Sequence, residues 1–306
     1  MNARPPARIA FLGFGLIGGS IAKALSAASP GGHGPGPSSR PYLSAWTPSG
    51  HGPAQAAADG VIDEAARSLP EAIDGADLVV IAAPAIDAIA LVERLGTDLA
   101  AHLTAGAVVT DVTSTKRAIA EAAARSGLPF VGGHPMAGRE ARGYGAAVPG
   151  LFVDRPWVIV IPEGTPAGLS DRVRWLAARC GARPIEMSAA DHDAAAAAVS
   201  HLPLVAAAAL VEAAHGGGGD AWAIARSLAS SGWASATRLA LGDPRMGAGI
   251  LATNSADVAA GIRAMRTALD AWLAELEGPE GPSADALQRR LEAARAILES
   301  SADGAG

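Results

Sequence analysis

The sequence predicts an α/β protein with an N-terminal Rossmann-type doubly wound sheet, followed by an all-α C-terminal domain. Three observations predict it. A short apolar strand near the N-terminus runs directly into a glycine-rich turn, apolar strands and helices then alternate to about residue 189, and no convincing strand follows. Because 306 residues are enough for two domains, we expect one domain over residues 1–189 and a helical domain over residues 190–306.

The first domain alternates strands with helices. Continuous apolar runs such as residues 78–82 are typical of strands that are covered on both faces of a parallel sheet. Strands are expected at residues 8–12, 42–46, 78–82, 107–111, 130–131, 157–161 and 183–187, and helices at 17–25, 55–59, 87–103, 115–126 and 169–179. Residues 29–41, rich in Gly, Pro and Ser, are expected to form a long surface loop. This alternation indicates a doubly wound, mainly parallel sheet.

The second domain is expected to form helices at residues 191–215, 220–230, 254–277 and 284–300. The most apolar run, 194–214, contains Ser200, His201, Pro203 and Glu212, so a buried helix is favoured over a membrane span. In the third helix, apolar residues alternate steps of four and three: Val258, Ile262, Met265, Leu269, Trp272 and Leu276. That stripe has two open interpretations, the core of the domain or a helix packed across a dimer.

Composition argues against several classes of partner. The net charge is −6 and the chain has no basic run, so a nucleic-acid-binding surface is not expected. Glycines and Lys23 interrupt the apolar stretch near the N-terminus, which therefore does not resemble a signal peptide. The single cysteine, Cys180, cannot form an internal disulfide and fits a reducing compartment. We therefore expect a cytoplasmic protein without membrane attachment, nucleic-acid partner or metal site.

The glycine-rich turn has the sequence Gly13-Phe14-Gly15-Leu16-Ile17-Gly18. It lies after a strand and at the start of a helix, where a dinucleotide-binding turn must lie. The first glycine permits a tight turn, the second lets a pyrophosphate approach the backbone, and the third lets helix and strand pack closely. Free N–H groups at the helix start would face the phosphates. The turn thus predicts a dinucleotide-binding domain, with a purely structural turn as the alternative.

The end of the second strand indicates which dinucleotide binds. An acid at this position binds the ribose 2′-hydroxyl of NAD and repels a 2′-phosphate. Residues 40–51 contain neither Asp nor Glu, and Trp46 stands near the position of that acid. Thr47, Ser49 and His51 offer neutral or weakly basic hydrogen-bonding groups. The sequence therefore predicts NAD(P) as the cofactor, with a lean towards NADP or towards the use of both.

Candidate catalytic groups follow neighbouring strands at the carboxyl edge of the sheet, which borders the ligand crevice in open α/β sheets. Pro84 and Asp111 end two of these strands and are assigned to the cofactor site. Ser114 caps the next helix, lies beside the nicotinamide, or does both. His134 is expected in a glycine-rich loop, residues 132–145, where an imidazole with a pKa near 6.5 can accept a proton. A structural histidine is the alternative.

Two clusters in the helical domain are candidates for substrate contacts. Ser200 and His201 precede Pro203, which removes a backbone donor and should kink the helix at the interdomain cleft. A core helix with a tolerated proline is the alternative. Gly232 lies in a Ser-Ser-Gly-Trp run, and Arg238 follows it. Because a guanidinium binds a carboxylate through two parallel hydrogen bonds, Arg238 is the best candidate for a carboxylate ligand, unless it is an ordinary surface arginine.

Together these residues resemble the prephenate dehydrogenase family, which includes the arogenate and cyclohexadienyl dehydrogenases of tyrosine biosynthesis. The resemblance rests on residues 132–138 (Gly-Gly-His-Pro-Met-Ala-Gly) followed by Glu140, on Asp111 with Ser114 and Lys116, and on residues 200–203 (Ser-His-Leu-Pro). It implies the oxidative decarboxylation of a small-molecule substrate, with hydride transfer to NAD(P). It also implies a homodimer formed through the helical domain.

The resemblance further implies roles for individual residues. His134 would accept a hydrogen bond from the ring 4-hydroxyl, and Ser114 would help align that hydroxyl with the nicotinamide. Arg238 would bind a substrate carboxylate, and Glu140 would gate the entrance. Many prephenate-specific members carry a histidine directly after the Leu-Pro pair, where this chain has Leu204. Arogenate-using members are more similar here and over residues 231–247, so both substrates are candidates.

Two other classes of protein are alternatives. Two-domain NAD(P) oxidoreductases of the 3-hydroxyacid dehydrogenase or imine reductase type usually rely on a lysine in the helical domain, whereas Lys23 and Lys116 both precede residue 190. A nonenzymatic dinucleotide sensor would need the glycine turn, but it would not need Ser114, His134 and Arg238 together.

Overall fold

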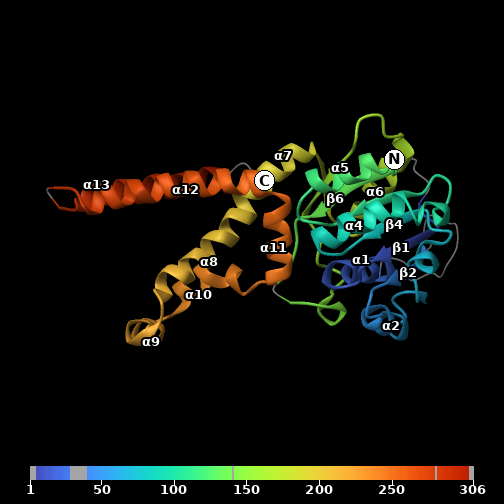
Figure 1. The fold of residues 1–306 in the computed structure, drawn as a ribbon, viewed down its shortest axis with the longest axis horizontal. Helices are drawn as coiled ribbons and strands as arrows, with labels where there is room; N and C mark the ends of the chain where they lie inside the picture. Colours follow the sequence, from blue (N-terminus) through green and yellow to red (C-terminus); the bar gives the residue numbers. More distant parts are fainter. Residues whose placement is uncertain (1–4, 28–39, 140, 280, 303–306) are drawn as a thin grey trace. The chain divides into compact units, whose positions relative to one another are not determined.

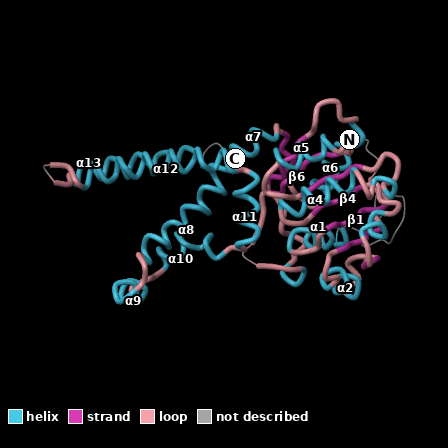
Figure 2. The backbone as a smooth tube through the Cα atoms, viewed as in Figure 1, coloured by secondary structure: helices cyan, strands magenta, loops and turns pink. Residues whose placement is uncertain are grey.

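A computed structural model of the chain describes residues 5–27, 40–139, 141–279 and 281–302. Its N-terminal part is built on an eight-stranded sheet with the order β3-β2-β1-β4-β5-β6-β7-β8 (Figures 1 and 2). The strands are β1 (Arg8–Leu12), β2 (Tyr42–Trp46), β3 (Glu64–Ala65), β4 (Leu78–Ile81), β5 (Val108–Asp111), β6 (Phe130–Pro135), β7 (Pro156–Val160) and β8 (Arg183–Glu186). Neighbouring strands are parallel except β6 and β7. The predicted mainly parallel sheet is confirmed.

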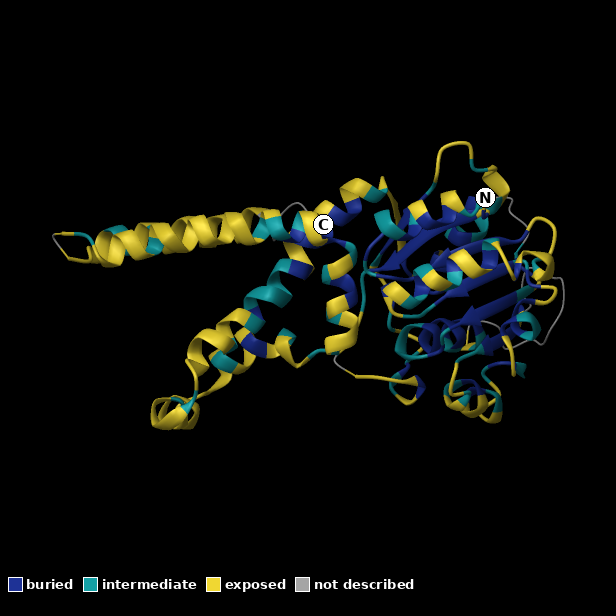
Figure 3. Cartoon of the chain, in the orientation of Figure 1, coloured by how far each residue is buried: buried dark blue, intermediate teal, exposed yellow. Residues whose placement is uncertain are grey.

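Helices cover both faces of the sheet. On one face lie α1 (Leu16–Ala27), α2 (His51–Ala58) and α6 (Ala167–Arg179), and on the other lie α3 (Leu69–Ile73), α4 (Ala85–Gly96) and α5 (Arg117–Arg125). Because successive side chains of a strand point to opposite faces, Ile9 and Phe11 join the first core, whereas Ala10 and Leu12 join the second. The buried sheet strands are dark blue in Figure 3. Short 3₁₀ turns, η1 (Ala100–His102) and η2 (Tyr144–Ala146), lie between these elements.

Four parallel strands end at one edge of the sheet. Leu12 of β1 pairs with Trp46 on one side and with Ile81 on the other, and Ile81 pairs with Asp111. The chain moves outwards from β1 in both directions, through β2 to β3 and through β4 to β5. Such a switch in direction leaves a crevice beyond the carboxyl ends of the strands. The glycine turn, which follows β1 directly, therefore opens into this crevice.

After β8 the described chain contains helices and no further strand. These are α7 (Ala189–Ala196), a π-helical turn η3 (Ala197–His201), α8 (Leu202–His215), α9 (Gly219–Ser227), α10 (Ser231–Thr237), the 3₁₀ turn η4 (Arg238–Leu241) and α11 (Pro244–Thr253). The hydroxyl of Ser188 accepts a hydrogen bond from the amide of Asp191 (3.0 Å) and so caps α7. Asp243 caps α11 by accepting from the amide of Arg245 (2.9 Å).

The chain divides into two compact units, residues 1–255 and residues 256–306. The second unit consists of α12 (Ser255–Leu276) and α13 (Ala284–Ala302), of which Ser255 itself belongs to the first unit. Within it, the guanidinium of Arg290 lies 4.5 Å from the ring centre of Trp272 and donates to the carbonyl of Ala268 (3.1 Å). The change from sheet to helices falls where residues 1–189 and 190–306 were expected to divide, and that division stays a prediction.

Several elements differ from the sequence expectation. α2 begins at His51 and not at residue 55, and the short elements β3 and α3 were not predicted. α9 ends at Ser227, and α10 and α11 follow where no helix was expected. Short elements such as these carry too few residues for a periodic pattern. Most of the expected loop at 29–41 lies outside the described residues.

Apolar side chains of the helical region are less covered than expected. The helix Ala189–His215 is long and apolar enough to cross a membrane by length and composition alone, yet only 22% of its most apolar window is buried. The expectation of a buried helix is therefore wrong for the single chain. Along α12, Val258 is buried, but Ile262, Met265, Leu269 and Leu276 are exposed. An intradomain core thus does not account for most of the stripe (Figure 3).

Candidate active site

Two cavities meet at the carboxyl edge of the sheet. One has a volume of about 330 Å³ and is lined by Ser114 and His134; we call it the His134 cavity. The other has a volume of about 780 Å³ and is lined by Trp46 at the end of β2; we call it the Trp46 cavity. Gly15 and Pro84 line both, so the two cavities adjoin at the glycine turn.

The turn at the start of α1 fits the pyrophosphate of a dinucleotide. A Cβ on Gly13, whose φ is +93°, would lie 2.4 Å from the carbonyl oxygen of Ala82. A Cβ on Gly15 would meet no atom within 4 Å, so the space in front of this residue can admit a ligand. The first helical hydrogen bond of α1 runs from the amide of Gly19 to the carbonyl of Gly15 (3.0 Å). The amide of Gly13 already donates to the carbonyl of Trp46 (2.9 Å), so the amides that can bind phosphate oxygens are those after it, at the start of α1.

Most residues predicted to bind the cofactor line these cavities. The lining includes Gly13, Gly15, Leu16, Ile17, Thr47, Ser49 and Pro84. Gly18 lines neither cavity: a Cβ there would lie 3.0 Å from the carbonyl oxygen of Gly13, so this glycine permits close packing of α1. Asp111 also lines neither cavity and is fully buried.

The Trp46 cavity contains two cations that sequence reasoning missed, Arg94 and Arg245. Arg94 pairs with Asp98 (3.0 Å), one turn further along α4. Arg245 donates to both carboxylate oxygens of Asp87 (2.9 Å each) and so connects α11 to α4. Asp87 is the only acid among the described residues of this lining, and it is paired. The lining therefore offers a phosphate more attraction than repulsion.

His134 lies in strand β6, and the expectation of a loop is wrong. Gly133 and His134 pair antiparallel with Ile159 and Val158 of β7. The amide of Gly133 donates to the Oδ1 atom of Asp111 (3.1 Å), and a Cβ on Gly133 would lie 2.6 Å from the main-chain oxygen of Asp111. A side chain at position 133 would thus push β6 away from β5. Because a strand holds a side chain more precisely than a loop, His134 has a defined position at the cavity wall.

A buried ion pair lies at the end of β5. The carboxylate of Asp111 pairs with the ammonium of Lys116 and also accepts from the amide of Thr113 (2.9 Å). Both side chains of the pair are fully buried. Burial lowers the pKa of Lys116, and the Asp111 carboxylate opposes that shift. Because Asp111 also binds the neighbour of His134, the pair fixes the ends of β5 and β6. Its role in this structure is internal, and Lys116 lines neither cavity.

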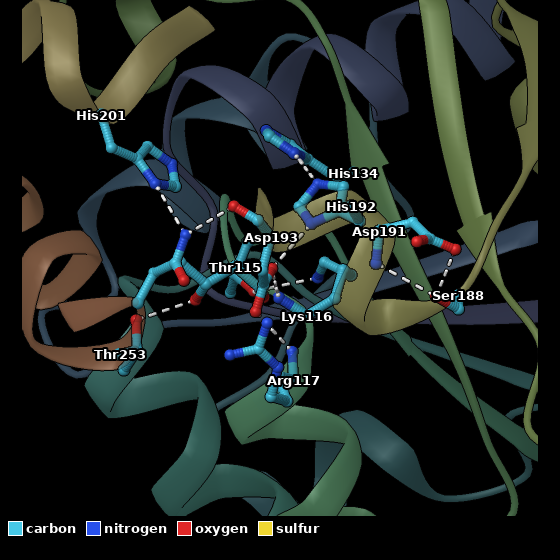
Figure 4. A network of polar contacts seen from close by, with 12 residues as sticks. Thr115, Lys116, Arg117, His134, Ser188, Asp191, His192, Asp193, His201 and Thr253 are labelled. Carbon is cyan, nitrogen blue, oxygen red and sulfur yellow. Dashed lines mark hydrogen bonds and ion pairs between the residues drawn. The ribbon is translucent and has the colours of Figure 1, made fainter. Parts of the chain in front are cut away.

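A series of polar contacts connects His134 to α7 (Figure 4). The Nδ1 atom of His134 lies 2.8 Å from Nε2 of His192, and Nδ1 of His192 lies 2.8 Å from Oδ1 of Asp193. All three side chains are buried. His192 and Asp193 were not predicted from the sequence. They lie 58 and 59 positions after His134 and belong to no recognisable motif.

The environment of His134 favours its neutral form. Burial holds the pKa of His134 well below its usual value, and the neighbouring side chains of His192, Lys116 and His201 lower it further. A neutral imidazole has one unprotonated ring nitrogen and can accept a proton. His134 is thus suited to act as a base at neutral pH.

Of the residues predicted to bind the substrate, His201 is buried and three others are exposed. His201 is buried, and its Nδ1 lies 3.2 Å from the amide nitrogen of Asn254. Ser200, Gly232 and Arg238 are exposed and line neither cavity in the single chain. Glu140 lies outside the described residues.

Ser114 does not cap α5, so that interpretation is wrong. The residue before the helix is Lys116, and the first amides of the helix are bound by the carboxylate of Asp193. Ser114 instead lines the His134 cavity. Its other predicted place, beside a nicotinamide, is compatible with this position.

The chain matches two family models, "Prephenate dehydrogenase, nucleotide-binding domain" over residues 48–186 and "Prephenate dehydrogenase, dimerization domain" over residues 188–291. A prephenate dehydrogenase of Bacillus subtilis is 30% identical over 273 residues, which are 88% of this chain and 68% of that protein. A cyclohexadienyl dehydrogenase of Zymomonas mobilis is 28% identical over 88% of this chain and 86% of that protein. The crystal structure of Synechocystis arogenate dehydrogenase matches with a TM-score of 0.76 and 30% identity, over 96% of this chain and 99% of that one.

Proposed function

The chain belongs to the prephenate dehydrogenase family, and we propose that it accepts arogenate as well as prephenate, with His134 taking the proton of the ring hydroxyl. Members of this family are NAD(P)-dependent dehydrogenases, and this chain is an enzyme of oxidative decarboxylation in tyrosine biosynthesis. One observation carries the role of His134. Its buried ring lines the His134 cavity together with Ser114, directly beside the Trp46 cavity.

The reaction needs two groups that act at one ring carbon. A base takes the proton of the hydroxyl on that carbon, and an acceptor takes the hydrogen of that carbon as hydride. Bound NAD(P)⁺ supplies the hydride acceptor. His134 takes the hydroxyl proton, the C–H electron pair leaves as hydride, and the C–O bond becomes a carbonyl. The ring carboxylate then leaves as CO₂, its electron pair completes the aromatic ring, and the phenolate oxygen recovers the proton from His134. The protein's contribution is to orient the hydroxyl, through Ser114 and His134, and to exclude water.

The lining of the Trp46 cavity supports the use of NADP at least as well as NAD. Thr47, Ser49 and His51 can donate hydrogen bonds, and Arg94 adds a cation to the lining of the same cavity. A 2′-phosphate would therefore gain charge-assisted hydrogen bonds there. Trp46→Asp should weaken NADPH binding at least tenfold relative to NADH, measured by the fluorescence of the reduced cofactor. An unchanged ratio would place the ribose elsewhere.

Leu204 supports the acceptance of arogenate. It lies on α8, with its Cδ2 3.4 Å from the position that a Cβ of Gly247 would occupy on α11. α11 also provides Met246 and Ile250 to the wall of the His134 cavity. An apolar side chain here offers no hydrogen bond to the keto group of prephenate. Leu204→His should raise kcat/KM for prephenate relative to arogenate, and an unchanged ratio would show that Leu204 does not face the substrate.

We keep Arg238 as the proposed carboxylate ligand, with Ser200, His201, Gly232 and Glu140 as further substrate residues. Arg238 begins the turn η4, whose last residue, Leu241, lines the His134 cavity. A contact made equally in the ground and transition states is uniform binding, so Arg238→Ala should mainly raise KM. An unchanged KM for both substrates would show that another group holds the carboxylate.

The assembly that we propose is a cytoplasmic homodimer formed through the helical domain. The match to a dimerisation domain over residues 188–291 supports it. So do the exposed apolar side chains of this region, among them Val199 and Leu228, which are 72% and 77% exposed. Covering such groups with a second copy removes apolar surface from water.

The proposed function is tested by steady-state kinetics with four pairs, prephenate or arogenate with NAD or NADP. We expect turnover of both substrates with both cofactors, with one CO₂ released for each reduced cofactor. His134→Ala should lower kcat by about 10²–10⁴-fold and leave cofactor affinity nearly unchanged. Near-normal turnover of that variant would remove His134 from the mechanism. Cofactor binding without turnover of either substrate would refute the function.

A further inference from the structure

We propose that His192 and Asp193 are positioning residues that fix the tautomer of His134, so that its Nε2 atom faces the substrate as a proton acceptor. This inference deepens the proposed function and rests on the role of His134 given there. It follows from the directions in which the three groups can donate and accept. Figure 4 shows the residues involved.

The carboxylate of Asp193 determines which atoms donate in the series of hydrogen bonds from His134 through His192 to Asp193. The amide of Lys116 donates to its Oδ1 atom (2.7 Å) and the amide of Arg117 donates to its Oδ2 atom (2.9 Å). Backbone N–H groups can only donate, so both oxygens must present lone pairs to them. Burial opposes ionisation here, but the hydrogen bonds from His192 and from the two amides lower the pKa of Asp193. Asp193 is therefore an acceptor.

With both imidazole rings neutral, only one placement of their protons satisfies these contacts. Because Oδ1 of Asp193 accepts, the Nδ1 atom of His192 must carry the proton of their 2.8 Å contact. A neutral imidazole has one N–H, so Nε2 of His192 is a lone pair and accepts from Nδ1 of His134 (2.8 Å). The proton of His134 is then on Nδ1. Its Nε2 atom makes no hydrogen bond to any described residue, and the side chain lines the His134 cavity.

The geometry also gives this series a role after proton transfer. His134 becomes a cation when it accepts the hydroxyl proton, and its Nδ1–H remains bonded to His192. The Asp193 carboxylate lies at the far end of that contact and stabilises the positive charge in a region of low dielectric. In the serine protease triad a buried carboxylate orients the base histidine directly, whereas here His192 stands between Asp193 and His134. His192 and Asp193 act through His134, and neither lines the cavity.

The decisive test compares His192→Phe with His192→Gln. Phenylalanine keeps a flat ring of similar size but cannot accept from His134, whereas the amide oxygen of glutamine can. Thr253→Val is the matched control. The hydroxyl of Thr253, at the end of α11, contacts that of Thr115 (2.8 Å), so it also joins a helix after β8 to the sheet region, but it touches neither His134 nor His192. The readouts are the protonated ring nitrogen of His134, from long-range ¹H–¹⁵N NMR of cofactor-free protein, together with kcat, KM and the melting temperature.

We expect the wild-type protein and Thr253→Val to carry the proton of His134 on Nδ1. His192→Phe should shift that proton towards Nε2 and lower kcat by about 10²–10⁴-fold with little change in KM, the upper end being the cost of a wrong tautomer in a serine protease. His192→Gln should retain the Nδ1–H form and recover at least a tenfold part of the lost kcat. The NMR signal of His134 is identified by its loss in His134→Ala.

Four results would overturn the inference. A wild-type His134 protonated on Nε2 would mean that His192 is a cation that donates to it. An unshifted tautomer in His192→Phe would mean that His192 does not orient the ring, and equal kcat values for Phe and Gln would mean that packing alone matters. If His192→Phe does not fold, the wild-type tautomer still decides. Normal turnover in His134→Ala would remove His134 as the base and overturn the inference with it. Cofactor binding without turnover of either substrate would instead refute the proposed function and leave the tautomer result standing.

Discussion

Gly13→Ala and Gly15→Ala are expected to fail in different ways, because an added methyl group meets different surroundings at the two positions. At Gly13, φ is +93° and the new Cβ would lie 2.4 Å from the carbonyl oxygen of Ala82. A residue forced into such a backbone conformation costs about 1–3 kcal/mol, and the end of β4 would have to move as well. At Gly15 the new Cβ would meet no atom within 4 Å, and φ is not in the left-handed range.

The magnitudes follow from these surroundings. Gly13→Ala should lower the free energy of unfolding by at least about 1–3 kcal/mol. Gly15→Ala should leave it unchanged or raise it by about 0.4–1 kcal/mol, because alanine restricts the unfolded chain. The same methyl group stands where the pyrophosphate approaches the backbone. It should therefore raise the Kd of NADH and of NADPH at least tenfold, which is about 1.4 kcal/mol.

Two measurements separate the effects. Urea unfolding of the cofactor-free variants, followed by tryptophan fluorescence, gives their stabilities, and titration with reduced cofactor gives their affinities. Wild-type affinity in Gly15→Ala would refute the placement of the pyrophosphate over this residue. Wild-type stability in Gly13→Ala would contradict the close approach of the turn to β4.

Three further predictions concern protonation, the buried ion pair and assembly. An ordinary histidine is half protonated near pH 6.5, but burial holds the pKa of His134 well below that value. We therefore expect kcat/KM at pH 6.5 to stay well above half of its plateau at pH 8. A half-maximal value would contradict the role of His134 as the base. Since the unfolded chain takes up that proton first, the free energy of unfolding should fall as the pH drops below about 6.5, which urea unfolding at pH 6 and 8 checks. Lys116→Met leaves a buried carboxylate without its cation and should lower the free energy of unfolding by about 3–5 kcal/mol. Lys23→Met, at a partly exposed position, should lower it by about 1 kcal/mol. Equal losses in urea unfolding would show that the buried ion pair is not needed for the fold. Leu269→Glu should convert the dimer to monomer in light scattering, whereas Thr267→Glu on the opposite side of α12 should not; a dimer that survives both would exclude this face.

The parts of the fold that the sequence predicted are those written in local patterns. The apolar strand β1 and the glycine turn occupy adjacent positions, and each glycine has a distinct steric reason. Gly13 approaches Ala82 and Gly18 approaches Gly13, while Gly15 leaves space. Buried strands such as β4 are continuous apolar runs. Because the strands are parallel, residues at their carboxyl ends come to the same edge, and this places Ser114 at the His134 cavity.

The length of β6 could not be predicted from its sequence. Gly132 and Gly133 have low strand propensity, and Pro135 cannot donate to a ladder. The strand forms because β7 pairs with it from the other side and because Asp111 binds the amide of Gly133. Both partners are distant in sequence, so the local pattern predicted a loop. The role of His134 as a base, which its residue type and small neighbours predict, stays a prediction.

His192 and Asp193 were missed for a different reason. They stand near the start of a helix, in the run Ala-Asp-His-Asp, where polar residues usually cap the helix or face solvent. The side chain of their neighbour Asp191 does so: it is exposed and accepts a hydrogen bond from the capping Ser188 (2.7 Å). Only the tertiary structure shows that the next two side chains turn inwards and are buried. A single sequence contains no signal that separates these cases.

The same contacts explain why residues 1–255 form one compact unit although the chain changes from sheet to helices after β8. Asp193 binds the first amides of α5, and the side-chain amide of Asn254 donates to the main-chain oxygen of Asp193 (2.8 Å). Each of these hydrogen bonds contributes about 0.5–1.5 kcal/mol net over hydration of the same groups, so together they hold α7 and α11 against the sheet. The carboxylate that holds α7 against α5 is also the one that sets the direction of the hydrogen bonds to His134. It follows that the acceptor form of His134 is fixed only while α7 is packed against α5 and the sheet, which couples the protonation of the base to the packing of α7.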